Sequence, residues 1–361
     1  MSLTLMKGSE AIAEAAIRAG ARFFFGYPIT PQTEIPEYMS ARMFDPEVNG
    51  CFLQAESEVA AINMVYGAAG TGARVITSSS SPGVSLKQEG ISYCAGAQLP
   101  CVILNVMRGG PGLGNIQASQ GDYFQATKGG GNGDYHLLTY APASIQEAIN
   151  IMGFAYDKAE KYRVPVLFLA DGIMCQMMEP VEMPEMVDYK PTKENKPWAC
   201  NGFKPGDAPE TRAEINSIFI DTESLAVHND ELQATYAEIK ANEVMYEEYK
   251  TDDAEYIITA FGTVARIGKS ACDALRAQGI KVGLFRPITV WPFPYNELKA
   301  CCNKPGVKAI LDVECNEGQM LEDVKLALEG TKPTDFFGHC GSQIPTTDEI
   351  INKIHEMKEG K

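Results

Sequence analysis

Short runs of apolar residues alternate with alanine-rich helical patterns along most of this chain, and that alternation limits its fold more than any other feature. When strands and helices alternate, consecutive strands pair in parallel and the helices cover both faces of the sheet. Up to residue 184 the expected strands are 23–25, 51–53, 74–77, 102–106 and 164–169, and the expected helices are 10–19, 31–43, 58–69, 85–97 and 144–161. The pattern therefore predicts an α/β fold built on a parallel sheet.

The chain has 361 residues, which is too long for one ordinary hydrophobic core and suits two domains. We expect a first domain at residues 1–185 and a smaller α/β domain at residues 251–361. Between them, residues 186–250 are polar and poor in apolar periodicity, which indicates a connecting arm followed by an exposed helix that runs from residue 230 to residue 250. Residues 108–134 are rich in glycine and irregular, and a functional loop is expected there.

Charge and cysteine content exclude several classes of function. With 31 basic and 47 acidic residues the net charge is −16, so we expect neither nucleic acid nor a membrane as a partner, since both need a basic surface. The ten cysteines form no Cys-x-x-Cys pair and the four histidines form no ligand-like pair, so no metal site is expected. The sequence shows no bilayer-spanning run and no signal-peptide pattern, and a cytoplasmic location is expected.

Three segments that follow predicted strands hold the candidate functional residues. The first is Gly26-Tyr27-Pro28-Ile29-Thr30-Pro31, in which Thr30 suits an N-cap and Pro31 suits the first helical position. By its local chemistry alone this segment is a capped turn between a strand and a helix. A helix N-terminus at the carboxyl end of a parallel strand also favours an anion, so the segment is at the same time a candidate binding site.

The second segment is Gln54-Ala55-Glu56-Ser57-Glu58, where an apolar strand meets a helix that is apolar nearly all round. Acidic residues in a first helical turn commonly do no more than complement the helix dipole. Because the helix after Glu58 is so apolar, however, its carboxylate could be partly buried, and a carboxylate in such a place is suited to moving protons.

The third segment is Arg108-Gly109-Gly110-Pro111-Gly112-Leu113-Gly114-Asn115, after the predicted strand 102–106. It is neither a dinucleotide fingerprint nor a P-loop, since it lacks GxGxxG at a helix start and a following Gly-Lys-Ser/Thr. A flexible loop is the simplest interpretation. We favour a functional one, because an arginine at a strand end can clamp a carboxylate and glycines let a backbone approach a ligand closely.

Taken together, these segments resemble the alpha-type chain of the thiamine-diphosphate-dependent 2-oxoacid:ferredoxin oxidoreductases. The resemblance covers nearly the whole chain and is weakest between residues 190 and 250. The matching segments are GYPITPQTEIPEY (26–38), FLQAESEVAAINMVYGAA (52–69), SSSSPGVSLKQEGISY (78–93), RGGPGLG (108–114), SQGDY (119–123), GDYHLLTYAPASIQEA (133–148) and RPITVWPFP (286–294).

Within this family, the QAESE, RGGPGLG and MMEP (177–180) segments are most similar to the branched-chain, or 2-oxoisovalerate, subgroup. The 2-oxoglutarate subgroup, which tends to have a second Asp-Glu pair and RGGPSTG, is the alternative. One residue departs from the subgroup: Asn132 stands where a histidine is usual, which puts any role of that histidine in doubt. From a different class, a plain nucleotide-binding protein or a non-catalytic scaffold subunit stays open.

The resemblance implies a fold, a cofactor and partners. Residues 1–185 would be the pyrimidine-binding domain and residues 251–361 a transketolase-C-terminal-like domain. This chain would bind the aminopyrimidine end of thiamine diphosphate, while Mg²⁺ and the diphosphate would lie on a beta subunit, because neither Gly133-Asp134-Tyr135 nor Ala170-Asp171-Gly172 is followed by the right pattern for such a site. Iron–sulfur clusters would lie on a gamma or ferredoxin-like subunit, with ferredoxin, coenzyme A and the 2-oxoacid completing the reaction.

The resemblance also implies roles for single residues. Glu58 aligns with the glutamate that hydrogen-bonds N1′ of the cofactor and so activates its C2 carbon. Thr30 and Arg108 would bind the carboxylate and carbonyl groups of the substrate. The cofactor-binding residues would be Tyr27, Pro28, Ile29 and Thr30 beside Glu58, together with Gly109, Gly110 and Asn115 of a loop that closes over the cofactor.

Overall fold

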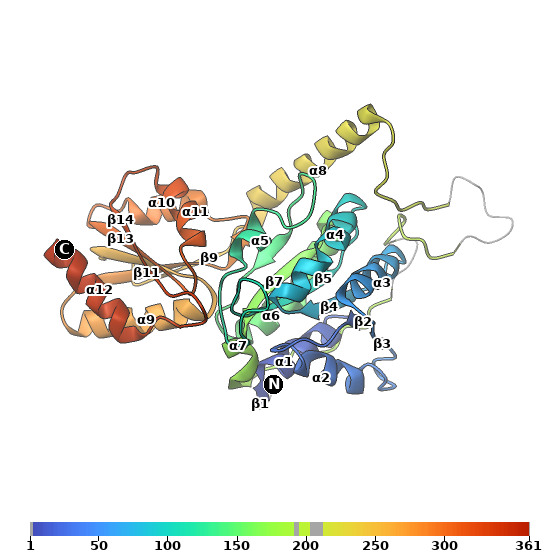
Figure 1. Ribbon diagram of the computed structural model, residues 1–361, viewed down its shortest axis with the longest axis horizontal. Coiled ribbons are helices and arrows are strands. Elements are labelled where there is room, and N and C mark those ends of the chain that lie inside the picture. Colours follow the sequence, from blue (N-terminus) through green and yellow to red (C-terminus); the bar gives the residue numbers. More distant parts are fainter. Residues whose placement is uncertain (1–2, 191–194, 203–211, 361) are drawn as a thin grey trace.

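The computed structural model describes residues 3–190, 195–202 and 212–360, and Figure 1 shows two parts, each built around a sheet, that lie side by side. The larger part contains a seven-stranded sheet that is parallel apart from one edge strand, β12, which pairs antiparallel with β6. Its strands, in spatial order, are β12 (Thr289–Trp291), β6 (Leu138–Tyr140), β7 (Val166–Asp171), β5 (Val102–Met107), β4 (Val75–Ser79), β2 (Phe23–Gly26) and β3 (Cys51–Gln54). The predicted α/β class and parallel sheet are confirmed.

Helices cover the large sheet on both faces. On one face, α1 (Gly8–Arg18) packs against α2 (Glu34–Arg42) and α6 (Ile145–Tyr162), and on the other α3 (Glu58–Gly70) packs against α4 (Ser81–Gly96). Right-handed crossovers place the helices on these two faces. The chain moves across the sheet in one direction from β2 to β3 and in the opposite direction from β3 to β4 and on to β5, so the helices of these connections lie on opposite faces.

The three central strands β4, β5 and β7 are buried along their whole lengths. A strand that is covered on both faces has no solvent side, so its sequence is mostly apolar instead of alternating, as in β5 and β7, whereas β4 begins apolar and ends in Thr77, Ser78 and Ser79. This is why these strands are recognisable in the sequence. The alanines of α1 are buried in the same core, where their small side chains let the helix lie close to its neighbours.

The smaller part contains a five-stranded sheet, again parallel apart from one edge strand, β9, which pairs antiparallel with β11. Its helices pack in two pairs, α9 with α12 and α10 with α11. In spatial order the strands are β14 (Thr334–Gly338), β13 (Ala309–Glu314), β10 (Tyr256–Thr259), β11 (Val282–Pro287) and β9 (Tyr246–Tyr249), and the helices are α9 (Gly262–Ala277), α10 (Tyr295–Cys302), α11 (Gln319–Leu328) and α12 (Thr347–Glu359).

The two parts are joined by more than a linker. The chain leaves β11 of the small sheet and immediately adds β12 to the edge of the large sheet. At this crossing the buried guanidinium of Arg286 forms two 2.8 Å bonds to the carboxylate of Glu147 on α6 and bonds of 2.9 and 2.7 Å to Glu247 on β9. Because those carboxylates belong to different parts, Arg286 fastens one part to the other.

The remaining elements are short apart from one long helix, α8 (Thr222–Asn242), which is mostly exposed and docks through Leu232, Tyr236 and Ile239. None of the helices in the described residues is both long and apolar enough to cross a membrane. The short elements are an antiparallel ribbon of β1 (Thr4–Lys7) with β8 (Met178–Val181), and the helices α5 (Tyr123–Thr127) and α7 (Gly172–Gln176).

Several element boundaries differ from the expected ones, and the helix expected over 85–97 already begins at Ser81. The helix expected to begin at Pro31 begins at Glu34 with Thr33 as its N-cap, because the chain first makes a turn closed by the bond from Gln32 N to Ile29 O. The helix expected from residue 230 to 250 ends at Asn242, since the residues after it pair with β11 as β9. The domain limits at residues 185 and 250 stay a proposal, and residues 191–194 and 203–211 of the expected arm lie outside the described residues.

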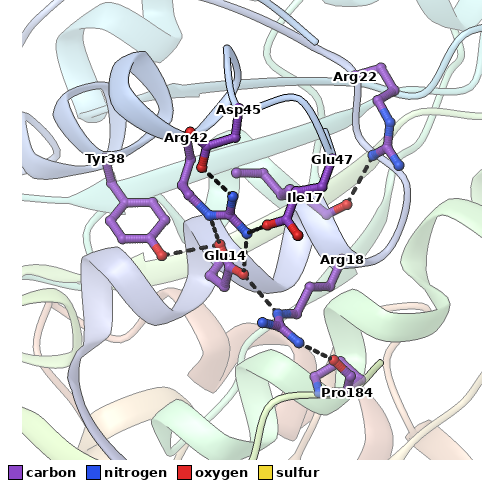
Figure 2. Close-up of polar contacts among 9 residues, drawn as sticks. All are labelled: Glu14, Ile17, Arg18, Arg22, Tyr38, Arg42, Asp45, Glu47 and Pro184. Carbon is purple, nitrogen blue, oxygen red and sulfur yellow. Dashed lines mark hydrogen bonds and ion pairs between the residues drawn. The ribbon is translucent and has the colours of Figure 1, made fainter. Parts of the chain in front are cut away.

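A buried carboxylate fastens α1 to two neighbouring segments (Figure 2). Glu14 accepts hydrogen bonds from Arg18 at 2.7 Å, from Arg42 on α2 at 3.1 and 3.2 Å, and from Tyr38 at 3.0 Å, while Arg18 also donates to Pro184 O after β8 at 2.9 Å. Burial raises the pKa of Glu14, but the bonds from Arg42 and Arg18 outweigh burial and hold that pKa below its ordinary value.

We expect Glu14→Gln to lower the free energy of unfolding by about 1–3 kcal/mol at pH 7, because it leaves buried donors without a charged acceptor. The folded-state pKa lies below the unfolded one, so this stabilisation is present above the unfolded pKa of 4.5 and is lost as the pH falls through the folded value. Urea unfolding of both chains across this range measures the difference. The prediction is contradicted if the difference in free energy of unfolding between the wild type and Glu14→Gln stays constant as the pH falls. Glu10→Gln on the same helix is the control, and it should lower the free energy of unfolding by less than about 1 kcal/mol.

Candidate functional site

The candidate residues meet at one edge of the large sheet. Strand β2 and its neighbours β3 and β4 end at this edge, but the chain leaves β2 toward one face and leaves β3 and β4 toward the other. Such a reversal opens a crevice outside the carboxyl ends of the strands, where open α/β sheets bind ligands. Tyr27 to Thr30 follow β2, Glu58 follows β3, and Arg108 follows β5, next to β4. The structure therefore brings the three candidate segments to one edge.

Glu58 is the first residue of α3 and is buried, with 5% of its surface exposed. Ser57 caps the helix, since its hydroxyl accepts a bond from Ala60 N at 3.2 Å. The Glu58 carboxylate lies against the first turn of α4, because a Cβ built on Gly83 would be 2.6 Å from Glu58 Oε1. Glu56, in contrast, is exposed and accepts a bond from the Ser57 hydroxyl at 2.9 Å. The buried carboxylate of this segment is that of Glu58.

The end of β4 places a buried hydroxyl beside this carboxylate. Ser79 Oγ would lie 2.1 Å from the same Cβ on Gly83, and it has no hydrogen-bond partner among the described residues. Buried polar groups in native proteins are nearly always hydrogen-bonded. An unpaired hydroxyl next to a buried carboxylate therefore indicates a place where a polar ligand completes the bonding.

The loop after β2 is held by a buried glutamine. Gln32 Nε2 donates to Tyr27 O at 3.0 Å, and Gln32 Oε1 accepts from Ser78 on β4 at 2.5 Å. Tyr27, Pro28 and Thr30 remain exposed at the crevice, and Ile29 is half-buried. The prediction that Thr30 is the N-cap of the following helix is wrong, since Thr33 stands there and Thr30 lies within the turn that precedes it.

Arg108 connects two of the segments across the crevice. Its Nη1 donates to Thr30 O at 2.8 Å and its Nη2 donates to Leu113 O at 3.0 Å. The Arg108 backbone nitrogen donates to Ser81 Oγ at the start of α4 at 3.0 Å. Although only 7% of the residue is exposed, Nε has no partner among the described residues. The guanidinium therefore holds both loops and keeps one N–H for a ligand.

The glycine-rich loop after Arg108 is folded onto the smaller part. Gly109 is buried, whereas Gly110 and Asn115 are exposed. Asn115 N donates to Gly109 O at 3.1 Å, and Asn115 Nδ2 donates to Gly341 O, beyond β14, at 3.2 Å. A residue more than two hundred positions away thus helps to set the shape of this loop.

Two charged residues beside the crevice, the buried Lys87 and the half-buried Asp122, are missed by sequence reasoning. Lys87 on α4 is fully buried, and its Nζ lies 2.5 Å from Thr77 Oγ1. Asp122 accepts bonds from Ser81 Oγ at 2.5 Å and from Asn105 Nδ2 at 2.8 Å, and burial raises its pKa above the ordinary value. In the sequence, Lys87 lies between Gly83 and Gly90 of one helix, and glycines within a helix indicate close packing. For Asp122 the sequence offers no such signal.

A large cavity lies elsewhere, at the junction of the two parts. It measures about 430 Å³, and its lining includes His136, Trp291, Tyr295 and Asp323 but none of the residues above. We place the candidate site at the crevice because the buried carboxylate, the unpaired hydroxyl and the free guanidinium N–H are gathered there. Volume alone does not identify the chemistry of a site.

The crevice fits one end of the cofactor that the resemblance implies. An aminopyrimidine ring has a basic nitrogen that can bond a buried carboxylate, and it has an amino group and a second nitrogen that can bond hydroxyls. Glu58 and Ser79 provide such groups. The described residues contain no cluster of three or more His, Cys, Asp or Glu side chains that could hold a metal ion. This edge of the sheet can therefore bind a heteroaromatic ring and exchange a proton with it.

Comparisons with known proteins agree with this arrangement. Residues 14–248 match the family model "Pyruvate flavodoxin/ferredoxin oxidoreductase, thiamine diP-bdg", and residues 254–350 match "Pyruvate:ferredoxin oxidoreductase core domain II". The chain is 46% identical, over 99% of its length and 98% of the relative's, to ketoisovalerate oxidoreductase subunit VorB of Methanothermobacter marburgensis. It is 34% identical, over 98% of each chain, to 2-oxoglutarate synthase subunit KorA of the same organism.

Among solved structures, the chain is similar to a 2-oxoglutarate:ferredoxin oxidoreductase from Magnetococcus marinus that has 2-oxoglutarate, coenzyme A and succinyl-CoA bound. The TM-score is 0.85 at 24% identity, and the alignment covers 98% of this chain and 65% of that one. The chain thus spans slightly less than two thirds of that solved chain. At this identity the likeness supports the fold.

We expect Gly83→Ala to lower the free energy of unfolding by on the order of 1–3 kcal/mol, because the new methyl group would displace Glu58 and Ser79 from a packed layer. Gly67→Ala on the exposed face of α3 is the matched control, since nothing lies within 4 Å of the added carbon. It should stabilise the chain by up to about 1 kcal/mol through helix propensity. Urea unfolding measures both. If the two variants have equal stability, the close contact between α3 and α4 is not as described.

Proposed function

The chain belongs to the thiamine-diphosphate-dependent 2-oxoacid:ferredoxin oxidoreductases, and on that premise we propose that it is the pyrimidine-binding subunit of a branched-chain 2-oxoacid oxidoreductase. Such an enzyme decarboxylates 2-oxoisovalerate oxidatively, transfers the acyl group to coenzyme A and passes the electrons to ferredoxin. The observation that carries the proposal is the buried carboxylate of Glu58 at the crevice, beside the Ser79 hydroxyl, which has no partner among the described residues. Higher identity to the ketoisovalerate subunit than to the 2-oxoglutarate subunit supports the substrate class.

Thiamine diphosphate, when bound, supplies a carbon nucleophile for the 2-oxo group and accepts the electron pair that decarboxylation releases. In this proposal Glu58 bonds N1′ of the aminopyrimidine and exchanges a proton with it. Burial of Glu58 keeps water from competing for that bond. Tyr27, Pro28 and Ile29 form a wall beside the ring, which suits the exposed position of Tyr27 and Pro28 on the loop after β2.

Arg108 and Thr30 would bind the carboxylate and carbonyl of the substrate. The support is the free Nε of Arg108, whose other two nitrogens already hold Thr30 O and Leu113 O. A guanidinium fixed by two such bonds loses little further freedom when it binds an anion. Gly109, Gly110 and Asn115 would close over the cofactor, and the bond from Asn115 to Gly341 would hold that loop in position.

The proposal requires partner subunits. We propose that a beta subunit holds Mg²⁺ and the diphosphate, and that a gamma or ferredoxin-like subunit carries iron–sulfur clusters. Large apolar side chains that are exposed around the crevice support a covering partner there: Tyr27, Leu53, Val59 and Leu86. A cytoplasmic location is proposed as well, since ten unpaired cysteines suit a reducing compartment.

We expect Glu58→Gln to slow exchange of the cofactor's C2 proton by roughly 10²–10⁴-fold in the assembled complex, the usual contribution of a positioned acid–base group. Glutamine keeps the volume and a hydrogen-bonding side chain, so the variant should still fold and assemble, with a loss on the order of 1–3 kcal/mol because the carboxylate it replaces is buried. Deuterium exchange at C2, followed by acid quench and NMR, isolates this step from decarboxylation and electron transfer.

Glu56→Gln is the matched control, because Glu56 is two residues away and exposed. It should exchange at nearly the wild-type rate. If Glu56→Gln is slow and Glu58→Gln is normal, the role belongs to Glu56. If neither variant slows exchange, cofactor activation does not reside on this chain, and a scaffold function would be favoured.

The substrate class is tested by a panel of 2-oxoacids assayed with the copurified complex and a viologen dye. We expect 2-oxoisovalerate to exceed 2-oxoglutarate in kcat/KM by roughly 10³-fold or more, because an apolar pocket leaves the second carboxylate unpaired. A complex that prefers 2-oxoglutarate would exclude the branched-chain assignment and leave membership of the family unchanged.

A further inference from the structure

Lys87 is a charged residue with an unusual environment. It lies on α4, no part of it is exposed, and its contacts are neutral: Nζ is 2.5 Å from Thr77 Oγ1 and 3.4 Å from Ser78 O. Lysine is almost never fully buried unless it is paired, because its ammonium group gives up strong hydration. A methionine or leucine would fill the same space without that cost.

The other buried lysine of the larger part shows what ordinary pairing looks like. Lys196 has 4% of its surface exposed, and its Nζ donates to Glu160 at 2.6 Å and to Gly72 O at 2.7 Å. Its carboxylate partner is in direct contact. Lys87 has no contact of this kind among the bonds above, so its charge must be balanced over a longer distance.

The geometry identifies Glu58 as the balancing charge. Thr77 and Ser79 are two residues apart on β4 and so project from the same face of the strand, on the order of 7 Å apart. The Lys87 ammonium lies at Thr77, and the Glu58 carboxylate lies beside Ser79. On α4, Lys87 is one turn after Gly83, the residue that Glu58 Oε1 approaches. The two charges therefore share one buried layer between α3, α4 and β4.

The electrostatic effects on the pKa of Lys87 agree with a buried layer that also contains Glu58. Burial lowers the pKa of Lys87 to about 7, and attraction by Glu58 opposes part of that effect. The other titratable group that acts on it is the thiol of Cys101, just before β5. Of these two groups, Glu58 is the carboxylate. The attraction is reciprocal, so the ammonium group of Lys87 stabilises the carboxylate of Glu58 as much as the carboxylate stabilises the ammonium group.

We propose that Lys87 is a positioning residue for Glu58: its buried ammonium group stabilises the carboxylate form, so that the shared proton resides on the cofactor's N1′ and not on Glu58. The proposal rests on the function proposed above for Glu58. It assigns to the α4 lysine an electrostatic role in cofactor activation, with no contact to the substrate. Deprotonation of Lys87 near neutral pH removes this support, and cofactor activation then weakens.

The first test uses the full chain without cofactor. Lysine labelled with ¹³C at Cε is titrated by NMR, and the Lys87 signal is assigned by its absence from Lys87→Met or Lys87→Arg. One lysine should titrate near pH 7, and in Glu58→Gln its midpoint should fall by roughly half a unit to one unit, a three- to tenfold change in the protonation equilibrium. The proposal is overturned if no lysine titrates below pH 9 or if Glu58→Gln leaves the midpoint unchanged.

The second test uses the assembled complex and follows C2 proton exchange against pH. The wild-type rate should fall as the pH rises through about 7. Lys87→Met should be roughly tenfold slower at pH 6.5 and should lack that decline, because an interaction worth one pKa unit changes the equilibrium tenfold. Methionine fills the space of the lysine stem, so the variant should still fold, with some loss of stability because the buried Glu58 loses its balancing charge.

Lys196→Met is the matched control, because it also removes a buried lysine but at a position that is not next to Glu58. It should retain the wild-type pH profile even where its stability is lower. If Glu58→Gln is slow while Lys87→Met keeps the wild-type rate and profile, the role of Lys87 fails and the proposed function stands. If Glu58→Gln itself exchanges normally, both fail.

Discussion

Burial of the large sheet on both faces is the constraint on which the rest of this structure depends. Strands β4, β5 and β7 have no solvent side, so their polar groups must be hydrogen-bonded or must lie at the strand ends. Thr77, Ser78 and Ser79 are found at the carboxyl end of β4, and Arg108 follows the end of β5. The reversal of the connections at β2 opens a crevice at that same edge. The site is therefore a consequence of how the sheet excludes water.

The smaller part contributes to the same edge from a distance. Arg286 joins Glu147 and Glu247 across the junction, and β12 extends the large sheet with residues of the C-terminal region. The hydrogen bond from Asn115 to Gly341 also attaches the glycine-rich loop beside Arg108 to the smaller part. The second part thus acts as a support that sets the position of a loop at the site. A flexible linker between two independent domains could not do this.

Electrostatics at the site differ from those of the chain as a whole. The net charge is −16, yet the crevice is lined by the guanidinium of Arg108 and backed by the ammonium of Lys87. Both are buried, where charges interact strongly because little water screens them. In the functions proposed above, Arg108 would bind the anionic substrate and Lys87 would balance the charge of Glu58. Local arrangement, and not overall composition, decides which charges this protein can bind.

The sequence by itself determined the α/β class, the central strands and the segments that hold Tyr27 to Thr30, Glu58 and Arg108, because apolar runs and strand-end motifs are local properties of the chain. It did not determine that α2 begins at Glu34, that residues 246–249 leave a helical pattern to pair with β11, or that Lys87 is buried and Asp122 half-buried beside the crevice. Those features arise from contacts between segments far apart in the chain. Only the tertiary structure could decide them, since the burial and the partners of a side chain belong to its surroundings and not to its own sequence.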